Sequence, residues 1–503
     1  MIEFLQALLQ ASQNVFFSPE NIFWICSGTF LGIVIGAIPG LGPALGVAII
    51  IPFTISMETI PALLFAITIY DGAMYGGSIS SILLNTPGDA SAAATTIEGF
   101  PMSKKGRSID ALMTCGVASS LGGVIGDVVV ILFCTVLGSF ILLFGTPEYA
   151  LLGIFGIIVV SRVSKGAFYK GLIAGLLGLG VTTIGTGTMS ADVRFTFGIW
   201  ELYEGIPFIA ALMGMFGIAT MSQLAGEPQA TISTGEMKGS RLKGCMDALR
   251  NWPTIIKSSL IGLFIGAFPG TGGSLANFVA YGETVRSNPN EKFGDGNPKG
   301  LVATESANNA MINGALLPTL LFGIPGSGTT AAFLAIMILH GFRWGQSLFT
   351  GEGLVVLLTI FMALFFSEII IIVFAFFTAR WIGYITTIDK NYIIPFVVIV
   401  AALGVFTIRF SFADLIALGV FGLIGFIMNR YGYPIVPAVI GAILGGLIEE
   451  NLLRSFTLGQ GGLIFFNPFT NPVSFIIVLL IVFVLFQPFI TAALGRLKKP
   501  NQS

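Results

Sequence analysis

Residues 32–46, GIVIGAIPGLGPALG, return in altered form as residues 262–276, GLFIGAFPGTGGSLA. At a separation of 230 positions, glycines and prolines coincide: Gly32, Gly36, Pro39, Gly40 and Gly42 match Gly262, Gly266, Pro269, Gly270 and Gly272. Further on, Ala73-Met74 with Gly77 resembles Ala310-Met311 with Gly314, and Thr86-Pro87-Gly88-Asp89 resembles Ile324-Pro325-Gly326-Ser327. An ordered set of matches indicates an internal repeat. We therefore expect residues 22–102 and 254–345 to be two copies of one structural unit, repeat 1 and repeat 2.

The chain that contains these copies is too apolar for a soluble protein. It has 503 residues, of which 54% are hydrophobic and 10% are charged, whereas a soluble domain is about 25% charged. This composition excludes a cytosolic enzyme, and a formal net charge of −1 excludes a nucleic-acid binder, which needs a clustered basic face. Runs without Asp, Glu, Lys or Arg, such as 21–57 and 306–339, exceed the roughly 20 residues that span a bilayer. Because backbone groups in lipid must be satisfied internally, we expect an all-α polytopic membrane protein with about 10–12 transmembrane segments.

The two repeats divide the rest of the chain into three parts. These are an N-terminal interfacial segment over residues 1–21, intervening transmembrane helices with a cytoplasmic loop over residues 103–253, and C-terminal transmembrane helices over residues 346–503. The first residues lack the basic region of a signal peptide, so we expect no cleavage there.

The distribution of Lys and Arg predicts the orientation, because short cytoplasmic loops are rich in both. Of the 24 basic residues, 17 fall in clusters that can all lie inside, 4 lie in the alternate loops, and Arg286, Lys292 and Lys299 lie in a polar loop whose side stays open. The N-terminus is then expected outside and the C-terminus inside, on the cytoplasmic face. Repeat 1 runs from outside to inside and repeat 2 from inside to outside. Inverted-topology repeats place substrate and ion sites between the two copies, near the middle of the membrane.

Each copy carries two Pro-Gly breaks. Pro removes a backbone donor and Gly permits unusual backbone conformations, so each break should interrupt a membrane helix. The helix that follows offers free N–H groups to an anion, and freed carbonyl groups suit Na⁺. The alternative for any single break is a kink or a tight helix crossing. The predicted substrate-binding residues are Pro39, Gly40, Leu41, Gly42, Pro43, Asn85, Thr86, Pro87, Gly88, Pro269, Gly270, Thr271, Gly272, Gly273, Asn308, Pro325, Gly326, Ser327, Thr329 and Thr330.

Acidic residues inside apolar runs are the second indication of a site, because charge in a membrane is costly and usually functional. Asp71, Asp89 and Glu305 are predicted as coupling-ion ligands or proton carriers, the alternative being hydrogen-bonded interior polar residues. Four other acids are interpreted as packing or helix-end residues: Asp127, Glu368, Glu449 and Glu450. His340 is the single histidine, and no nucleotide, metal or nucleophile motif is present. We expect no enzymatic activity, no structural metal and no cofactor other than a coupling Na⁺ or H⁺.

Three stretches carry a resemblance to a known family. GAIPGLGP at 36–43, YDGAMYGGSISSILLNTPGDASAAATTIEGFPM at 70–102 and GAFPGTGG at 266–273 resemble the large membrane subunit of the tripartite tricarboxylate transporter family. The resemblance implies two Pro-Gly-x-Gly loops at 39–42 and 269–272, and an Asn-x-Pro-Gly-Asp stretch at 85–89. It also implies a bacterial inner-membrane location and two partners: a small membrane subunit and a periplasmic substrate-binding protein.

The leading hypothesis is secondary active, cation-coupled uptake of a small di- or tricarboxylate such as citrate, received from the binding protein. The alternative is a passive anion or ion channel that uses the same loops as a filter. A membrane-embedded enzyme is disfavoured, because the apolar runs hold no acid/base or metal cluster. The sequence leaves open the carboxylate, the choice between Na⁺ and H⁺, the number of spans, the oligomeric state, and an elevator or rocking movement.

Overall fold

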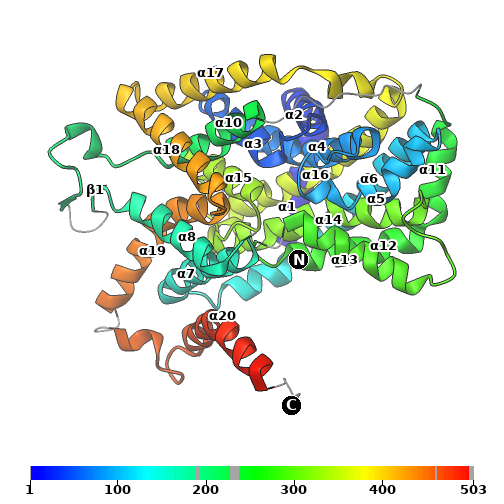
Figure 1. Cartoon of the computed structure of the whole chain (residues 1–503). Coiled ribbons are helices and arrows are strands. Elements are labelled where there is room, and N and C mark those ends of the chain that lie inside the picture. Colours follow the sequence, from blue (N-terminus) through cyan, green and yellow to red (C-terminus); the bar gives the residue numbers. More distant parts are fainter. Residues whose placement is uncertain are drawn as a thin grey trace, which may run out of the picture. The chain divides into compact units, whose positions relative to one another are not determined.

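The computed structural model describes residues 2–164, 166–187, 192–226, 237–270, 272–458 and 462–497, and helices dominate these ranges (Figure 1). Within them, nine helices are long and apolar enough to cross a membrane, and five shorter apolar helices accompany them. The prediction of an all-α polytopic membrane protein is confirmed. The apolar run 21–57 is divided at its Pro-Gly break into two helices, and so is the run 306–339.

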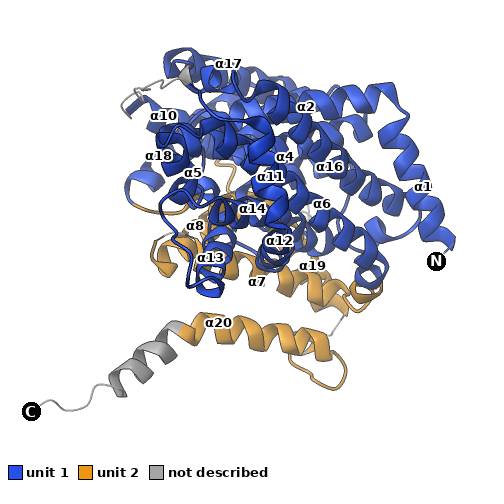
Figure 2. Cartoon of the chain, turned by 90° about the vertical axis from the view of Figure 1, so that its right-hand side faces the viewer, with its two compact units in different colours: residues 1–138, 207–431 blue, residues 139–206, 432–503 orange. Residues whose placement is uncertain are grey.

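The chain forms two compact units (Figure 2). Unit 1 comprises residues 1–138 and 207–431 and contains both repeats. Its helices before residue 138 are α1 (Ile2–Phe16), α2 (Pro19–Ala37), α3 (Pro43–Thr54), α4 (Thr59–Leu84), η1 (Ser91–Ala93), α5 (Thr96–Lys104) and most of α6 (Ser108–Ile141). Its helices after residue 207 are α9 (Phe208–Leu212), η3 (Met213–Ile218), α10 (Ala219–Gly226), α11 (Arg241–Arg250), α12 (Trp252–Gly266), α13 (Gly272–Ser287), α14 (Pro298–Phe322), α15 (Gly328–Leu339), η4 (Gln346–Phe349), α16 (Gly351–Thr378), η5 (Ile382–Thr387), α17 (Lys390–Arg409) and α18 (Phe412–Arg430).

Unit 2 comprises residues 139–206 and 432–503. Its elements are α7 (Thr146–Val163), α8 (Phe168–Thr182), β1 (Gly185–Thr186), β2 (Val193–Arg194), η2 (Trp200–Leu202), α19 (Ile435–Leu458), η6 (Gly462–Phe465) and α20 (Pro472–Leu497). The two strands pair antiparallel, with Gly185 opposite Arg194. Arg194 also forms an ion pair with Glu449 of α19, 2.6 Å between Nη1 and Oε1, so Glu449 anchors this short hairpin.

The two repeats are built around the same glycine-mediated helix packing. A Cβ added at Gly32 of α2 would lie 2.4 Å from the carbonyl oxygen of Ile69 in α4. At the matching position, a Cβ added at Gly262 of α12 would lie 2.3 Å from the carbonyl oxygen of Ala307 in α14. Such distances are far below van der Waals contact, so only glycine lets these backbones approach so closely. The α2–α4 pair of repeat 1 therefore corresponds to the α12–α14 pair of repeat 2.

The structure corrects the alignment of α4 with α14 by one residue. Gly76 lies against the carbonyl oxygen of Ile33, and Gly314 lies against the carbonyl oxygen of Leu263. Because Ile33 and Leu263 match, Gly76 and not Gly77 is the counterpart of Gly314. The alignment by sequence matched identical residues, but the sequence does not show which face of the helix each glycine occupies. In the corrected alignment, Asn309 of repeat 2 is the residue equivalent to Asp71 of repeat 1. Glu305 is therefore not the equivalent of Asp71.

The polar loop between α13 and α14 is held against the end of α5. The buried carboxylate of Glu98 accepts hydrogen bonds from the backbone N–H groups of Gly294 (2.6 Å), Gly296 (2.7 Å) and Asn297 (2.7 Å). Lys105 adds an ion pair of 2.8 Å to Asp295 and holds the pKa of that carboxyl group below its usual value. Because of these contacts, the loop, which carries Lys292, lies on the same face of unit 1 as the basic cluster at 104–107.

Candidate functional site

In each repeat the two Pro-Gly breaks are joined by one backbone hydrogen bond. The N–H of Gly40 donates to the carbonyl oxygen of Gly88 at 3.2 Å, and the N–H of Gly270 donates to that of Gly326 at 2.9 Å. Gly40 and Gly270 have φ values of +85° and +79°, a conformation that glycine adopts without strain. Four breaks that are far apart in sequence are thus two matched pairs in space.

The second break of each repeat begins with a helix end of the same type. The residue that caps the C-terminus of α4 is Asn85, with φ 58°, and the one that caps α14 is Gly323, with φ 68°; both are in the left-handed region. The following residues differ in exposure: Asn85 and Thr86 are exposed, Pro87 is half-buried, and Gly88 is buried. In repeat 2, Pro325 and Gly326 are both buried. A Cβ at Gly88 would lie 2.3 Å from the carbonyl oxygen of Gly36, so this break packs directly on α2.

After the breaks, new helices begin. Gly42 and Pro43 start α3 at the predicted position, and Leu41 is buried just before them. Gly272 and Gly273 start α13, while Thr271 lies outside the described residues. The first N–H groups of such helices have no intrahelical acceptor. The N-termini of α3 and α13 are therefore the groups here that suit a carboxylate oxygen.

The helix starts at the second breaks are capped by their own side chains. Ser327 and Thr330 form a reciprocal cap on α15: the N–H of Thr330 donates to Ser327 Oγ at 3.2 Å, and the N–H of Ser327 donates to Thr330 Oγ1 at 2.9 Å. In repeat 1, Asp89 Oδ1 accepts hydrogen bonds from Ser91 Oγ at 2.6 Å and from the N–H of Ala92 at 3.3 Å. Asp89 therefore acts as a cap at the position that Ser327 holds in repeat 2.

Contacts between the repeats bring the breaks of one copy to the helices of the other. Asn277 of α13 donates from Nδ2 to the carbonyl oxygen of Ser91 at 2.8 Å and to Asn308 Oδ1 at 2.9 Å. Asn308 Nδ2 donates in turn to the carbonyl oxygen of Met74 at 3.3 Å. On the equivalent side, α3 packs against α15, which contains the buried Thr329. The structure thus gathers the predicted loops of both repeats around α4 and α14.

The acids predicted as coupling-ion ligands have different surroundings. Glu305 is fully buried and accepts hydrogen bonds from Thr95, from Cys115 (3.1 Å) and from Ser119 (2.9 Å). Asp71 is equally buried, but its Oδ1 accepts one hydrogen bond, from Asn309 at 3.2 Å. Its Oδ2 accepts no hydrogen bond of normal geometry from the described residues, although Ser367 and Glu368 lie beside this carboxyl group.

Two acids interpreted as packing residues belong with Asp71. Glu368 of α16 and Asp127 of α6 are 2% and 0% exposed, and both lie close enough to Asp71 for their charges to interact. In the sequence, Asp127 and Glu368 each stand out only as a single acid within a long apolar run. Their proximity to Asp71 could not be predicted from the sequence, because α4, α6 and α16 are far apart along the chain. Within the described residues, no group of three His, Cys, Asp or Glu side chains is arranged to hold a metal ion.

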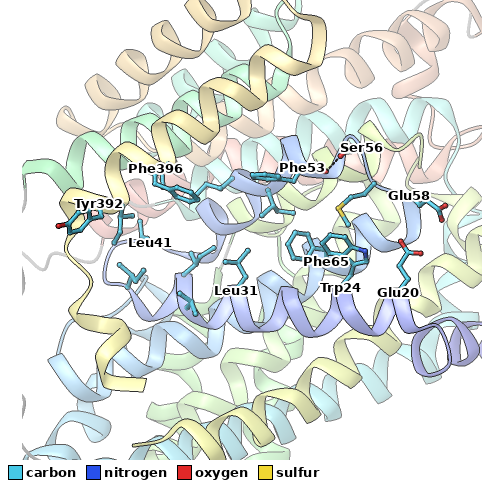
Figure 3. Close-up of a pocket in the computed structure, with 18 residues that line it drawn as sticks. Glu20, Trp24, Leu31, Leu41, Phe53, Ser56, Glu58, Phe65, Tyr392 and Phe396 are labelled. Atoms are coloured by element: carbon cyan, nitrogen blue, oxygen red, sulfur yellow. Dashed lines mark hydrogen bonds between the residues drawn. The ribbon is translucent and has the colours of Figure 1, made fainter. Parts of the chain in front are cut away.

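A large pocket in unit 1 lies apart from most of the predicted site. It has a volume of about 940 Å³ and runs between α2, α3 and α17, with Glu20 and Glu58 at one end and Tyr392 at the other (Figure 3). Of the predicted substrate-binding residues, Leu41 alone lines it. Most of its lining is apolar, and its two acids would repel a carboxylate, so this pocket does not fit the predicted substrate.

Comparisons with known proteins agree with the resemblance seen in the sequence. Residues 22–440 match the model of the family described as the tripartite tricarboxylate transporter TctA family. The chain is 32% identical over 460 residues to an uncharacterized 52.8 kDa protein in the TAR-I ttuC' 3' region of Agrobacterium vitis, covering 91% of each chain. It is 30% identical over 216 residues to an uncharacterized protein in the TAR-II ttuC' 3' region of the same organism, covering 42% of this chain and 87% of the relative. No solved structure gives a significant match.

The family match spans both repeats, all four breaks and most of the long apolar helices described above. The family is that of a transporter made of several components, which implies partner subunits. The chain therefore belongs to the tripartite tricarboxylate transporter TctA family and is a multi-pass membrane component of such a transporter.

Proposed function

We propose that this protein carries a small di- or tricarboxylate across the bacterial inner membrane by secondary active, cation-coupled uptake, and that it receives the substrate from a periplasmic binding protein. A small membrane subunit would complete the assembly. The observation that carries the proposal is the matched pair of backbone hydrogen bonds, Gly40 to Gly88 and Gly270 to Gly326. Each bond joins the two helix breaks of one repeat. Non-helical backbone at membrane depth is tolerated only if it is buried in protein or lines a cavity.

The chemistry of these breaks suits a carboxylate. The starts of α3 and α13 present backbone N–H groups and the positive ends of two helix dipoles. Gly40 is exposed, and Gly42, Gly270 and Gly272 are partly exposed, so a ligand can reach this backbone without displacing side chains. Backbone donors bind many carboxylates, and specificity would therefore come in part from the binding protein.

The orientation is part of the same proposal. Lys and Arg are enriched on the face that includes residues 104–107 and the loop held by Glu98, and this enrichment favours a cytoplasmic location for that face. The N-terminus would then be periplasmic and the C-terminus cytoplasmic. Asp71 and Asn309, which occupy equivalent positions in the two repeats, contact each other directly. Such self-pairing is expected of copies related by a two-fold axis, and an axis in the membrane plane would make the repeats inverted.

Uptake into proteoliposomes tests the proposal. The protein is reconstituted with its small subunit, and labelled citrate, succinate or malate is supplied with or without binding protein and with or without an imposed Na⁺ or proton gradient. We expect accumulation above the external concentration only when both binding protein and gradient are present. Uptake that never exceeds equilibrium would indicate a channel, and uptake indifferent to both conditions would contradict the proposal.

A further inference from the structure

Four helices of unit 1 place a polar side chain in one fully buried cluster, which we call the acid cluster: Asp71, Asp127, Asn309 and Glu368. Asp71 and Asn309 come from α4 and α14, the two central helices of the repeats, and Asp127 and Glu368 come from α6 and α16, which follow repeat 1 and repeat 2. The first three side chains are 0% exposed and Glu368 is 2% exposed. The acid cluster therefore lies where the two copies meet.

One amide nitrogen joins two of the acids. Asn309 Nδ2 lies 3.2 Å from Asp71 Oδ1, 3.1 Å from Glu368 Oε1 and 3.4 Å from Glu368 Oε2. Two carboxyl groups that share one donor are within a few ångströms of each other. Two negative charges at that separation in a low-dielectric interior repel strongly.

The acid cluster is left unsatisfied by the protein around it. Asp71 Oδ2, both carboxylate oxygens of Asp127 and Asn309 Oδ1 are buried without a hydrogen bond of normal geometry from the described residues, although Asn313 lies beside Asp127. No ion pair within the described ranges involves any of the three acids. Burying an unpaired carboxylate costs several kcal/mol. By contrast, the buried carboxylate of Glu305 accepts three side-chain hydrogen bonds.

The fold makes room for this arrangement. A Cβ added at Gly123 of α6 would lie 1.5 Å from Glu368 Oε1, so the Glu368 carboxyl group sits directly on a glycine. Among the described residues, the other groups that face the acid cluster are the Asn313 amide beside Asp127, the Tyr70 hydroxyl on α4 and the paired hydroxyls of Thr29 and Ser367 at 2.9 Å. None of them is a cation.

The geometry points to a proton-binding site formed by Asp71 and Glu368, bridged by Asn309 and assisted by Asp127, through which substrate uptake is coupled to proton entry. This inference rests on the proposed cation-coupled transport and adds the residues and the ion. A proton from the outer aqueous side adds to one carboxylate oxygen to form a neutral carboxyl group, and it returns to water on the inner side after the conformational change. A proton fits better than a metal ion, because the N–H groups of Asn309 point toward both carboxylates, and because a proton needs one oxygen whereas a metal ion needs several.

Glu368→Gln and Asp71→Asn test this site in the same proteoliposomes. A pH-sensitive dye inside the vesicles reports proton entry while labelled citrate, succinate or malate is taken up. In wild type we expect proton entry with uptake and no need for Na⁺. In both variants we expect gradient-driven accumulation to fall by about tenfold, while exchange of internal for external substrate at equal concentrations continues, because exchange does not require the proton to leave. A protonated substrate brings its own protons into the vesicle, and it does so in wild type and variants alike. The quantity compared is therefore the difference in proton entry between wild type and each variant.

Glu148→Gln is the matched control. Glu148 is a buried acid of α7 that accepts a hydrogen bond from the N–H of Gly145 at 2.9 Å, and it lies in unit 2. Its variant should accumulate substrate as wild type does. Accumulation and proton entry at wild-type level in Glu368→Gln and Asp71→Asn would overturn the site, as would wild-type uptake driven by Na⁺ without proton movement. Failure of the proposed function itself looks different, because wild type would then not accumulate carboxylate above its external concentration under any gradient.

If a variant fails to assemble, infrared spectroscopy of the purified wild-type protein tests whether a buried carboxyl group binds a proton. A protonated buried carboxyl group gives a C=O stretching band separate from that of carboxylates. We expect such a band that disappears as the pH is raised and that is reduced in whichever variant folds. Its absence at every pH would overturn the proposal.

Discussion

Asp71 and Glu305 have the same burial but different partners. Glu305 accepts three side-chain hydrogen bonds, whereas Asp71 shares one amide donor with Glu368. The sequence predicted that both would be important, because an acid in an apolar run is rarely accidental. It could not rank them, because the partners that distinguish them lie on helices many residues away.

The Pro-Gly breaks were more predictable at this scale. Pro39-Gly40 and Pro269-Gly270 end their helices for local reasons: proline cannot continue the hydrogen-bond ladder, and glycine accepts positive φ. The internal capping of Ser327 by Thr330 was not anticipated, since both side chains were expected to serve the substrate. Local backbone behaviour follows from local sequence, but the partner of a side chain does not.

Replacing Gly40 or Gly270 with Val should abolish uptake while leaving membrane insertion intact. Both residues have positive φ, a conformation that is unfavourable for a β-branched residue by roughly 1–2 kcal/mol. Under the proposed function, the new side chain would also block the approach of substrate to the backbone. Uptake of labelled carboxylate and the yield of inserted protein are the two measurements.

Gly106→Val is the control for backbone strain alone. Gly106 has φ +73° and open space around its Cα, and it lies in the connection between α5 and α6. It should retain uptake. Wild-type uptake in both Gly40→Val and Gly270→Val would mean that the loops are kinks and not binding elements.

At the scale of elements, long apolar runs predicted the helices and the repeat predicted which helices correspond. The pairing of α2 with α4 and of α12 with α14 follows from glycines spaced along one helix face. The one-residue error in aligning α4 with α14 arose because adjacent glycines, Gly76 and Gly77, point in different directions. The π-helical turn Met213–Ile218 was not predicted, because nothing in the local sequence distinguishes it from an α-helix.

Gly262→Ala should destabilise the protein by about 1–3 kcal/mol, because the new methyl group must push α12 away from α14. Gly282→Ala on α13 is the comparison, since a Cβ there meets no atom within 4 Å and alanine favours a helix. Thermal unfolding of the purified variants in detergent measures both. Equal melting temperatures for the two variants would show that the close approach of α12 to α14 contributes little to stability.

At the scale of the whole molecule, the sequence predicted a membrane transporter and its family, and the comparisons confirm that family. The division into two units was beyond sequence reasoning, because unit 2 combines residues 139–206 with residues 432–503. Chain segments so far apart reveal their association only through contacts such as Arg194 with Glu449.

The central claim is that the two repeats enter the membrane from opposite sides. It is tested most directly by labelling single cysteines in intact and in inverted vesicles, after the four native cysteines have been replaced. Glu20→Cys marks the start of repeat 1 and Arg250→Cys the start of repeat 2, and both positions are exposed. An impermeant thiol reagent should label position 20 only from the periplasmic side and position 250 only from the cytoplasmic side. Labelling of both positions from the same side would contradict the account.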